Sequence, residues 1–384
     1  MKADLHFSAN ILNIILTVLK KVKVMKIIFK LLNILPPDKK RFFVTEGISV
    51  WFSQVIPFIN NIPNLPYTLD TIELLTEELI CIDYIDNPHW KSTLECICNP
   101  RKYPAYMKSL LESLNENWHR VWIILIKLLR KQITDNVGNI GINPMLSVVE
   151  MAFKLDVNTR CKAFSCWRVL IENFSAETNE TYLIKKVKLL IIPFTLHNAK
   201  VEQTALAKLK TWYHLIYSFH VHLDKFSEVI LIPFLHFCFG KPVVTKPICP
   251  SGMISDATKA QSVEAFINIL DNSHCLECVN FPRLKGKILT RRVLVDHLSD
   301  WMHCLYSALK ICGENKDFTN EQILCLWKGL IGCLGEFPDN NIRRDLINEI
   351  INVLNKLTET SNKLYETLDK LPCRASTDYI KSLY

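Results

Sequence analysis

Three stretches of the sequence share one pattern: Trp122-Ile-Ile-Leu-Ile-Lys-Leu-Leu129, Trp167-Arg-Val-Leu-Ile-Glu-Asn-Phe174 and Trp212-Tyr-His-Leu-Ile-Tyr-Ser-Phe219. Each begins with a tryptophan, and successive tryptophans lie 45 residues apart. The apolar residues recur at positions i, i+3, i+4 and i+7, which form one stripe along an α-helix. The pattern therefore predicts three helices with buried faces, and we expect Trp122, Trp167 and Trp212 to form the core of a structural repeat.

A second repeated element marks the ends of other apolar helices. The tripeptide Ile-Pro-Phe begins at Ile56, Ile192 and Ile232, and proline ends or kinks the helix that it follows. The repeating unit is then a helix, a turn, a proline-marked helix and a turn, over about 40–45 residues. This period is typical of HEAT and armadillo repeats, whereas an irregular helical bundle is the alternative. A looser fourth copy of the tryptophan pattern begins at Trp327.

The composition agrees with an all-α fold. Only 10 of the 384 residues are glycine, which parallel α/β enzymes and β-sandwiches need for tight turns and phosphate-binding loops. No segment alternates apolar and polar residues between glycine turns, so we expect no sheet. We therefore predict a HEAT/armadillo-like α-solenoid of stacked helical hairpins, with repeats over residues 1–239, a proline-rich loop over residues 240–258 and further repeats over residues 259–384.

Motifs typical of enzymes are missing from the sequence. It contains no dinucleotide-binding or phosphate-binding glycine loop, no zinc-protease motif and no Gly-x-Ser-x-Gly. Cys275-Leu-Glu-Cys278 has the spacing of half a zinc site, but a structural zinc ion needs a second pair of ligands. His220-x-His222 with His236-x-Cys238 is a second weak candidate. We expect a protein that is not an enzyme and binds neither a cofactor nor a metal ion.

The cysteines and the lengths of the apolar runs indicate the cellular compartment of the protein. Most of the 14 cysteines lie in apolar runs, where a free cysteine acts as a small core residue. No run reaches the roughly 18 consecutive apolar residues of a membrane span, and no secretion signal is visible. We expect an intracellular protein with reduced thiols, no disulfide and no membrane partner.

Clusters of lysine and arginine are the candidate functional residues. The net charge of +8 is a weak field over 384 residues, and it permits a polyanionic partner without requiring one. Binding to a phosphate backbone needs repeated cations on one surface, and equal repeat positions line one edge of a solenoid. Each cluster could equally be a solvated helix face. The candidate DNA-binding residues are Lys185, Lys186, Lys188, Lys208, Lys210, Arg283, Lys285, Lys287, Arg291 and Arg292, and other basic clusters lie at Lys20–Lys30, Lys39–Arg41 and Lys127–Lys131.

The helix that contains Lys185, Lys186 and Lys188 gives the sharpest expectation. Its apolar stripe should turn inward, which leaves the three lysines projecting toward solvent. We expect Lys208 and Lys210 on a nearby surface, because they flank the core stripe of the next repeat. The stripe that we expect to be buried consists of Leu183, Ile184, Val187, Leu190 and Ile191.

Around these helices the sequence is similar to a known family. The segments Cys161–Phe174, Lys186–Pro193 and Glu202–Ile216 resemble the N-terminal region of the telomere-associated Rap-interacting factor family, and the likeness is strongest over Trp118–Phe237. The resemblance implies a HEAT/armadillo-type solenoid in a nuclear protein of chromosomes and their telomeric regions. Members of this family bind DNA, act at telomeres, restrain replication-origin firing by bringing in a type-one protein phosphatase, and influence double-strand-break repair.

The resemblance implies a scaffold function. We expect a chromatin- and telomere-associated scaffold that binds DNA and contributes to telomere maintenance, replication timing in the cell cycle and DNA repair. Family members are far longer than this chain, and their phosphatase-docking motifs usually lie outside the repeats, so a phosphatase would bind through regions absent here. The alternative is a protein-interaction solenoid, such as an adaptor, that does not bind nucleic acid. The oligomeric state stays open.

Overall fold

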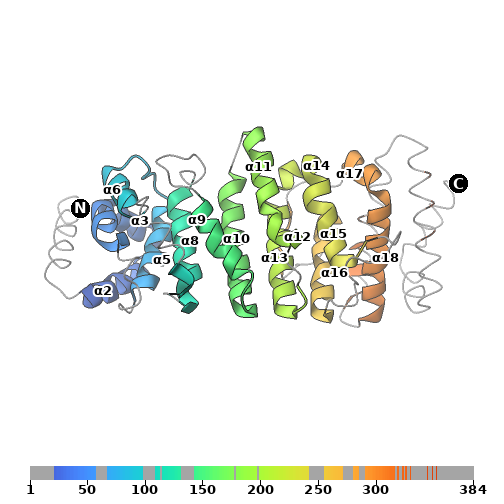
Figure 1. Cartoon of the computed structure of the whole chain (residues 1–384), viewed down its shortest axis with the longest axis horizontal. Helices are drawn as coiled ribbons and strands as arrows, with labels where there is room; N and C mark the ends of the chain where they lie inside the picture. The colour runs from blue at the N-terminus through green and yellow to red at the C-terminus, as the bar shows by residue number, and fades with distance from the viewer. Residues whose placement is uncertain are drawn as a thin grey trace. The chain divides into compact units, whose positions relative to one another are not determined.

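The computed structural model describes residues 21–57, 67–97, 109–112, 115–130, 142–176, 179–196, 199–241, 255–270, 280–284 and 290–315, together with isolated positions between 318 and 352. Every regular element in these ranges is helical and none is a strand, so the predicted all-α fold is confirmed (Figure 1). The chain divides into two compact units, Met1–Ala176 and Glu177–Tyr384.

In unit 1, four helices pack in sequence, each against the next: α2 with α5, α5 with α8, and α8 with α10. Shorter helices lie against this row, with α3 on α5 and α9 on α10. The helices and helical turns of unit 1 are α2 (Lys21–Ile34), α3 (Pro37–Glu46), α4 (Ile48–Val50), the π-helix η1 (Trp51–Val55), α5 (Thr68–Leu79), α6 (Pro88–Ile97), η3 (Asn115–Asn117), α8 (Trp118–Leu129), α9 (Asn143–Ala152) and α10 (Val157–Ser175).

Unit 2 has a row of helices of its own, because α13 packs on α16 and α16 on α18 (Figure 1). The π-helix η7 and α15 pack against α13, and α15 also contacts α16 and α18. Each unit is therefore a stack of helical hairpins, as the repeat predicts. The elements of unit 2 are α11 (Glu180–Leu190), α12 (Ile192–Leu196), α13 (Glu202–Ser218), η6 (His220–His222), α14 (Leu223–Phe226), η7 (Ser227–Leu231), α15 (Ile232–Phe239), α16 (Asp256–Leu270), α17 (Arg291–Asp296) and α18 (Leu298–Glu314).

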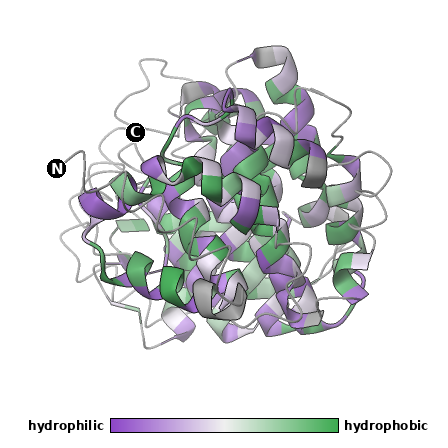
Figure 2. Cartoon of the chain, turned by 90° about the vertical axis from the view of Figure 1, so that its left-hand side faces the viewer, coloured by the Kyte–Doolittle hydropathy of each residue, from purple (hydrophilic) through white to green (hydrophobic). Residues whose placement is uncertain are grey.

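The three repeated tryptophans are buried, as the sequence predicts. Trp122 on α8, Trp167 on α10 and Trp212 on α13 are each at most 2% exposed. The indole N–H of Trp122 donates to the backbone carbonyl of Met145 at 2.9 Å, and that of Trp212 donates to the carbonyl of Ile230 at 3.1 Å. The tryptophan thus fills the space between two helices and also satisfies a buried carbonyl on the second one. Hydrophobic and hydrophilic residues alternate along individual helices, as expected for helices with one buried face (Figure 2).

Two further tryptophans have the same structural role, although the sequence pattern did not identify them. The indole N–H of Trp51 donates to the carbonyl of Val44 at 2.9 Å, and that of Trp301 donates to Val293 at 3.1 Å. Trp301 follows Trp212 by 89 residues, close to twice the repeat spacing, and its i+3, i+4 and i+7 residues are all fully buried. Two of these are Cys304 and Ala308, which are weak hydrophobic signals in a sequence.

The Ile-Pro-Phe elements change the helix in two ways. At Ile56 and Ile232 the preceding turn widens into a π-helix, and the isoleucine N–H donates five residues back, to Trp51 and Ser227 respectively. Proline has no N–H, and its ring collides with the carbonyl four residues earlier, so a wider turn relieves the conflict. At Ile192 the helix instead ends, because α11 stops at Leu190 and α12 begins two residues later.

Several sequence predictions fall outside the described residues. These are the fourth tryptophan copy at Trp327 and most of the proline-rich loop, of which residues 242–254 are not described. The helix after that loop, α16, begins at Asp256. Among the described residues, none of the helices is both long and apolar enough to cross a membrane.

Candidate nucleic-acid interface

Helix α11 presents lysines on its outer side. The side chain of Asn179 begins the helix by accepting hydrogen bonds from the N–H groups of Thr181 and Tyr182. The carboxyl-terminal lysine of the candidate cluster, Lys188, is exposed, as is Lys185, whereas Lys186 is half-buried. The residues that hold the inner side of α11 in the core are Leu183, Val187 and Leu190, each at most 3% exposed.

The prediction that Ile184 turns inward is wrong. Its side chain is 40% exposed, and Tyr182 two residues earlier is 56% exposed. The buried stripe follows positions i, i+4 and i+7 from Leu183, so it is narrower than the sequence pattern suggested, and Ile184 lies beyond its edge. The Lys185 ammonium lies 6.0 Å from the centre of the Tyr182 ring. The outer face of α11 is therefore a mixture of cationic, aromatic and aliphatic groups.

Lys208 does not lie on a surface, contrary to expectation. It is 5% exposed, and its ammonium lies 4.8 Å from the ring centre of Phe237 and 5.7 Å from that of Trp212. The reason is its register, because Lys208 is four residues before Trp212 and so shares the buried face of α13. Lys210, two residues further on, is exposed. Lys208 therefore belongs to the core of the repeat rather than to an interface.

The basic segment after α16 is anchored to α13. Phe281 is buried against Tyr213, with 4.6 Å between ring centres, and the Tyr213 hydroxyl donates to the carbonyl of Pro282 at 2.8 Å. Arg283, the next residue, is exposed. These contacts fix the segment that contains Arg283 against the helix from which Lys210 projects.

The other end of this segment begins α17. Thr290 is the N-cap, its hydroxyl accepts from the N–H of Val293, and it also bonds the Asp224 carboxylate. Arg292 is exposed and pairs with Asp296 at 3.6 Å. Lys285, Lys287 and the side chain of Arg291 lie outside the described residues. The candidate cations that the structure describes thus form two groups, one on α11 and one on α13 and the segment that follows α16.

The basic cluster near Lys127 has internal partners instead. Lys127 pairs with Glu77 of α5. The Arg130 guanidinium donates to the carbonyl of Ile80 and lies 4.7 Å from the centre of the Tyr84 ring. It therefore caps the carboxyl end of α5, where carbonyls lack helical partners. Burial raises the pKa of Tyr84 to about 12, so its hydroxyl stays protonated and donates to the carbonyl of Leu128 at 2.7 Å.

The weak zinc-ligand candidates, from which no metal site was predicted, do not gather in the described part of the chain. Within the ranges that the structure describes, no three His, Cys, Asp or Glu side chains converge on a metal-sized site. His236 lies 2.5 Å from a carboxylate oxygen of Asp300, and the Nδ1 of His220 lies 2.8 Å from the carbonyl of Tyr217. Cys275 and Cys278 are outside the described residues.

One cysteine departs from the expectation of free thiols. Cys325 is disulfide-bonded. A disulfide depends on two sulfur atoms meeting in space, which the spacing of cysteines along the sequence does not reveal. The free cysteines of the described part are Cys81, Cys161, Cys166, Cys238, Cys304 and Cys312.

We expect a thiol reagent to separate these free cysteines by burial. Burial raises the pKa of Cys238 and Cys312 to about 12 and that of Cys166 well above its usual value, so almost no thiolate forms at pH 8. Exposed Cys81 should react with iodoacetamide in the native protein, and the buried cysteines only after unfolding. Mass spectrometry of timed samples measures this order, and labelling of Cys166 as fast as Cys81 would contradict it.

Comparisons with known proteins identify the repeat region. Residues 94–229 match the family model described as Rap1-interacting factor 1 N terminal. The resemblance to the Rap-interacting factor family is confirmed. The region similar to this family contains all three repeated tryptophans and the α11 lysines, whereas the segment from Arg283 to Arg292 lies outside it.

Curated proteins from animals are also similar to part of this chain. The protein named Telomere-associated protein RIF1 of Drosophila melanogaster is 31% identical over 140 residues, which is 36% of this chain and 10% of the relative. The human protein of that name is 29% identical over 136 residues, which is 35% of this chain and 5% of the relative. The chain therefore spans a tenth or less of the length of these curated relatives. No solved structure matches.

Proposed function

We propose that this chain is a nuclear scaffold that associates with chromosomes at telomeric regions and binds DNA through its helical repeats. The support is its similarity to proteins named telomere-associated, together with the match of residues 94–229, which contain the three repeated tryptophans, to the family model. The Rap-interacting factor family is a scaffold family rather than an enzyme family. Roles in telomere maintenance, replication timing and double-strand-break repair belong to the same proposal, as does a type-one phosphatase that binds through regions absent from this chain.

The observation that supports DNA binding most directly is the outer face of α11. Lys185 and Lys188 are exposed there, and Lys186 is half-buried at the edge. Their helix lies inside the region matched by the family, and its inner stripe is fixed in the core. Cations held on a rigid element can contact successive phosphates without reading bases. Lys210 and Arg283 offer a second group of cations in the same unit.

The triple substitution of Lys185, Lys186 and Lys188 by glutamate tests this surface. We expect the folded state to be retained, because Lys185 and Lys188 are exposed and Lys186 is only half-buried, and exposed substitutions usually change stability by less than about 0.5 kcal/mol each. Affinity for duplex DNA should fall alike for unrelated sequences, and its dependence on salt should become shallower, because fewer phosphates are neutralised. Fluorescence anisotropy with labelled duplexes at several salt concentrations measures both effects.

A matched control keeps the change in net charge the same. Lys91, Lys154 and Lys310 are exposed elsewhere in the chain, and their triple substitution by glutamate should weaken binding less than the α11 variant does. Equal losses in both variants would show that only net charge matters. Unchanged binding by the α11 variant would move the DNA surface to Lys210, Arg283 and Arg292, or to the cluster Lys20–Lys30.

The alternative function is that of an adaptor that binds only proteins. The same titration separates the two functions, because an adaptor would show no salt-sensitive affinity for DNA in either variant or in the unmodified chain.

A further inference from the structure

The outer face of α11 carries an aromatic ring as well as lysines. Tyr182 is 56% exposed, and among the described residues it is the most exposed aromatic side chain, ahead of Phe42 at 42% and Tyr67 at 40%. The Tyr67 ring also packs against Phe29, with 5.7 Å between ring centres. A phosphate backbone offers negative charge and hydrogen-bond acceptors but no apolar surface, so backbone contacts alone leave the exposed Tyr182 ring unexplained.

The helix holds the backbone of Tyr182 in a fixed position. The side chain of Asn179 accepts hydrogen bonds from the N–H groups of Thr181 at 3.1 Å and Tyr182 at 3.4 Å. Leu183, the next residue, is 3% exposed and lies in the core. A tyrosine on such a backbone has only two side-chain torsions to lose when its ring contacts a ligand. This preorganisation lowers the entropic cost of binding.

Two ammonium groups accompany the ring. The Lys185 ammonium lies 6.0 Å from the centre of the Tyr182 ring, and Lys188 is exposed three residues further on. Side chains three residues apart are neighbours on a helix surface, and Tyr182 and Lys188 are separated by about 9 Å along the axis.

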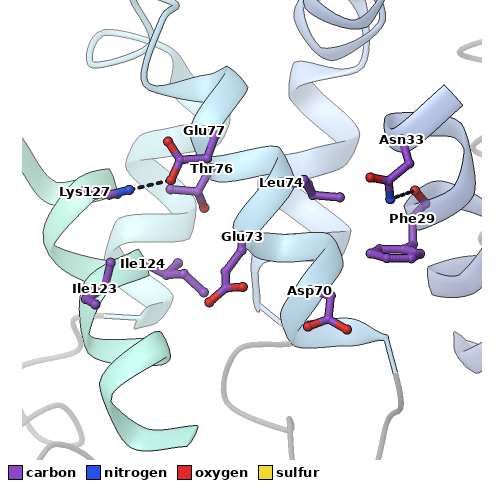
Figure 3. Close-up of a pocket in the computed structure, with 10 residues that line it drawn as sticks. All are labelled: Phe29, Asn33, Asp70, Glu73, Leu74, Thr76, Glu77, Ile123, Ile124 and Lys127. Atoms are coloured by element: carbon purple, nitrogen blue, oxygen red, sulfur yellow. Dashed lines mark hydrogen bonds and ion pairs between the residues drawn. The ribbon is translucent and has the colours of Figure 1, made fainter. Parts of the chain in front are cut away.

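These lysines differ from the basic cluster of α8. There, Lys127 pairs with Glu77 of α5 (Figure 3). In the part of the chain that the structure describes, neither Lys185 nor Lys188 pairs with a carboxylate. Their charges therefore remain available to an anion that lies beside the Tyr182 ring.

An exposed ring with cations beside it fits an unpaired nucleobase and its neighbouring phosphates. Proteins that bind single strands stack bases on aromatic side chains, while cations contact the backbone. In a duplex, the faces of the bases are covered by the adjacent base pairs, so the ring could stack only after a base had left the helix, which costs energy. Ile184, which is 40% exposed, offers further apolar surface on the same helix.

We propose that Tyr182 stacks on an unpaired base of a single-stranded nucleic acid, while Lys185 and Lys188 contact neighbouring phosphates. This inference rests on the proposed function, because it names the form of nucleic acid that the same α11 surface recognises. Single strands of DNA and of RNA share this chemistry, and separate binding measurements distinguish them. The stacking contact adds to the phosphate contacts, so duplex DNA still binds through the lysines.

The test uses the full chain with labelled oligothymidylate, oligouridylate and a mixed-sequence DNA duplex of the same length, followed by fluorescence anisotropy at one salt concentration. Tyr182→Ala should lower the affinity for single strands about tenfold, which equals about 1.4 kcal/mol and falls in the range for loss of one base–aromatic stack. Its affinity for the duplex should not change. Tyr182→Phe keeps the ring and should bind single strands as the unmodified chain does. A loss confined to one of the two single strands identifies that nucleic acid as the ligand.

A matched control removes an exposed aromatic ring elsewhere. Phe42→Ala in unit 1 should leave the affinities for single strands and for the duplex unchanged. An equal loss for Phe42→Ala and Tyr182→Ala, an equal loss of single-strand and duplex binding by Tyr182→Ala, or no loss at all would overturn the stacking contact and leave the proposed DNA binding in place. No binding of any nucleic acid by the unmodified chain would overturn both.

A second measurement needs no variant. Irradiation of an iodouracil-substituted single strand joins its base to an aromatic side chain in contact, so mass spectrometry of the unmodified chain should find the cross-link on Tyr182. Cross-links only at residues outside α11 would overturn the proposal.

Discussion

Replacing Trp122 with alanine should lower the free energy of unfolding of unit 1 by roughly 3–5 kcal/mol, the usual loss for a large core aromatic. Trp122 is fully buried, and its indole N–H donates to the carbonyl of Met145 at 2.9 Å. The substitution leaves a cavity between α8 and α9 and also an unpaired buried carbonyl, and both effects destabilise the folded state. Thermal and urea denaturation followed by circular dichroism measures the loss.

An exposed aromatic residue provides the control for this substitution. Tyr182 on α11 is 56% exposed, so Tyr182→Ala should change stability by less than about 0.5 kcal/mol. Trp122→Phe keeps much of the apolar volume but loses the indole donor. Its loss of stability should lie between those of Tyr182→Ala and Trp122→Ala. If Trp122→Ala is as stable as Tyr182→Ala, the tryptophan helices are not the core of the repeat.

Replacing Lys208 with glutamate should destabilise unit 2 by roughly 3–5 kcal/mol, the cost of leaving an uncompensated charge buried. The Lys208 ammonium lies over the rings of Phe237 and Trp212, whose faces attract a cation and repel an anion. Lys208→Met keeps the aliphatic stem and should cost much less. Both changes can be read from urea denaturation curves.

Lys210→Glu is the matched variant for Lys208→Glu, because it makes the same charge change two residues away at an exposed position. It should alter stability by less than about 0.5 kcal/mol. Equal effects of the two variants would contradict the burial of Lys208.

The repeat could be predicted from the sequence because its signal is periodic. The tryptophan helices carry large apolar residues at four positions of one helical stripe, and this pattern recurs three times at a constant offset of 45 residues. The same pattern does not reveal Trp301, because two positions of its stripe carry the small residues Cys304 and Ala308. The sequence wrongly predicts that Ile184 is buried. Periodicity gives the direction of a buried stripe but not its width, which depends on the neighbouring helices.

The functional surface was harder to predict for a related reason. A sequence shows where cations are but not which acidic groups they meet, and Lys127 pairs with a glutamate 50 residues away. Lys208 lies in the core and Lys210 is exposed, a difference that follows from the register of Lys208 four residues before Trp212 rather than from residue type. Asp70, Glu73 and Glu77 share a helical stripe in the sequence, but their ion pairs with Arg120 and Lys127 require the packing of α5 against α8.

The measurement that tests the central claim most directly is a salt titration of duplex DNA binding by the unmodified chain. We predict binding at low salt, with the logarithm of the association constant falling linearly as the logarithm of salt concentration rises, because several phosphates release their counterions. The slope should be similar for unrelated DNA sequences. An affinity that does not change with salt, or no binding at low salt, would contradict the account and leave the repeats as a scaffold for proteins alone.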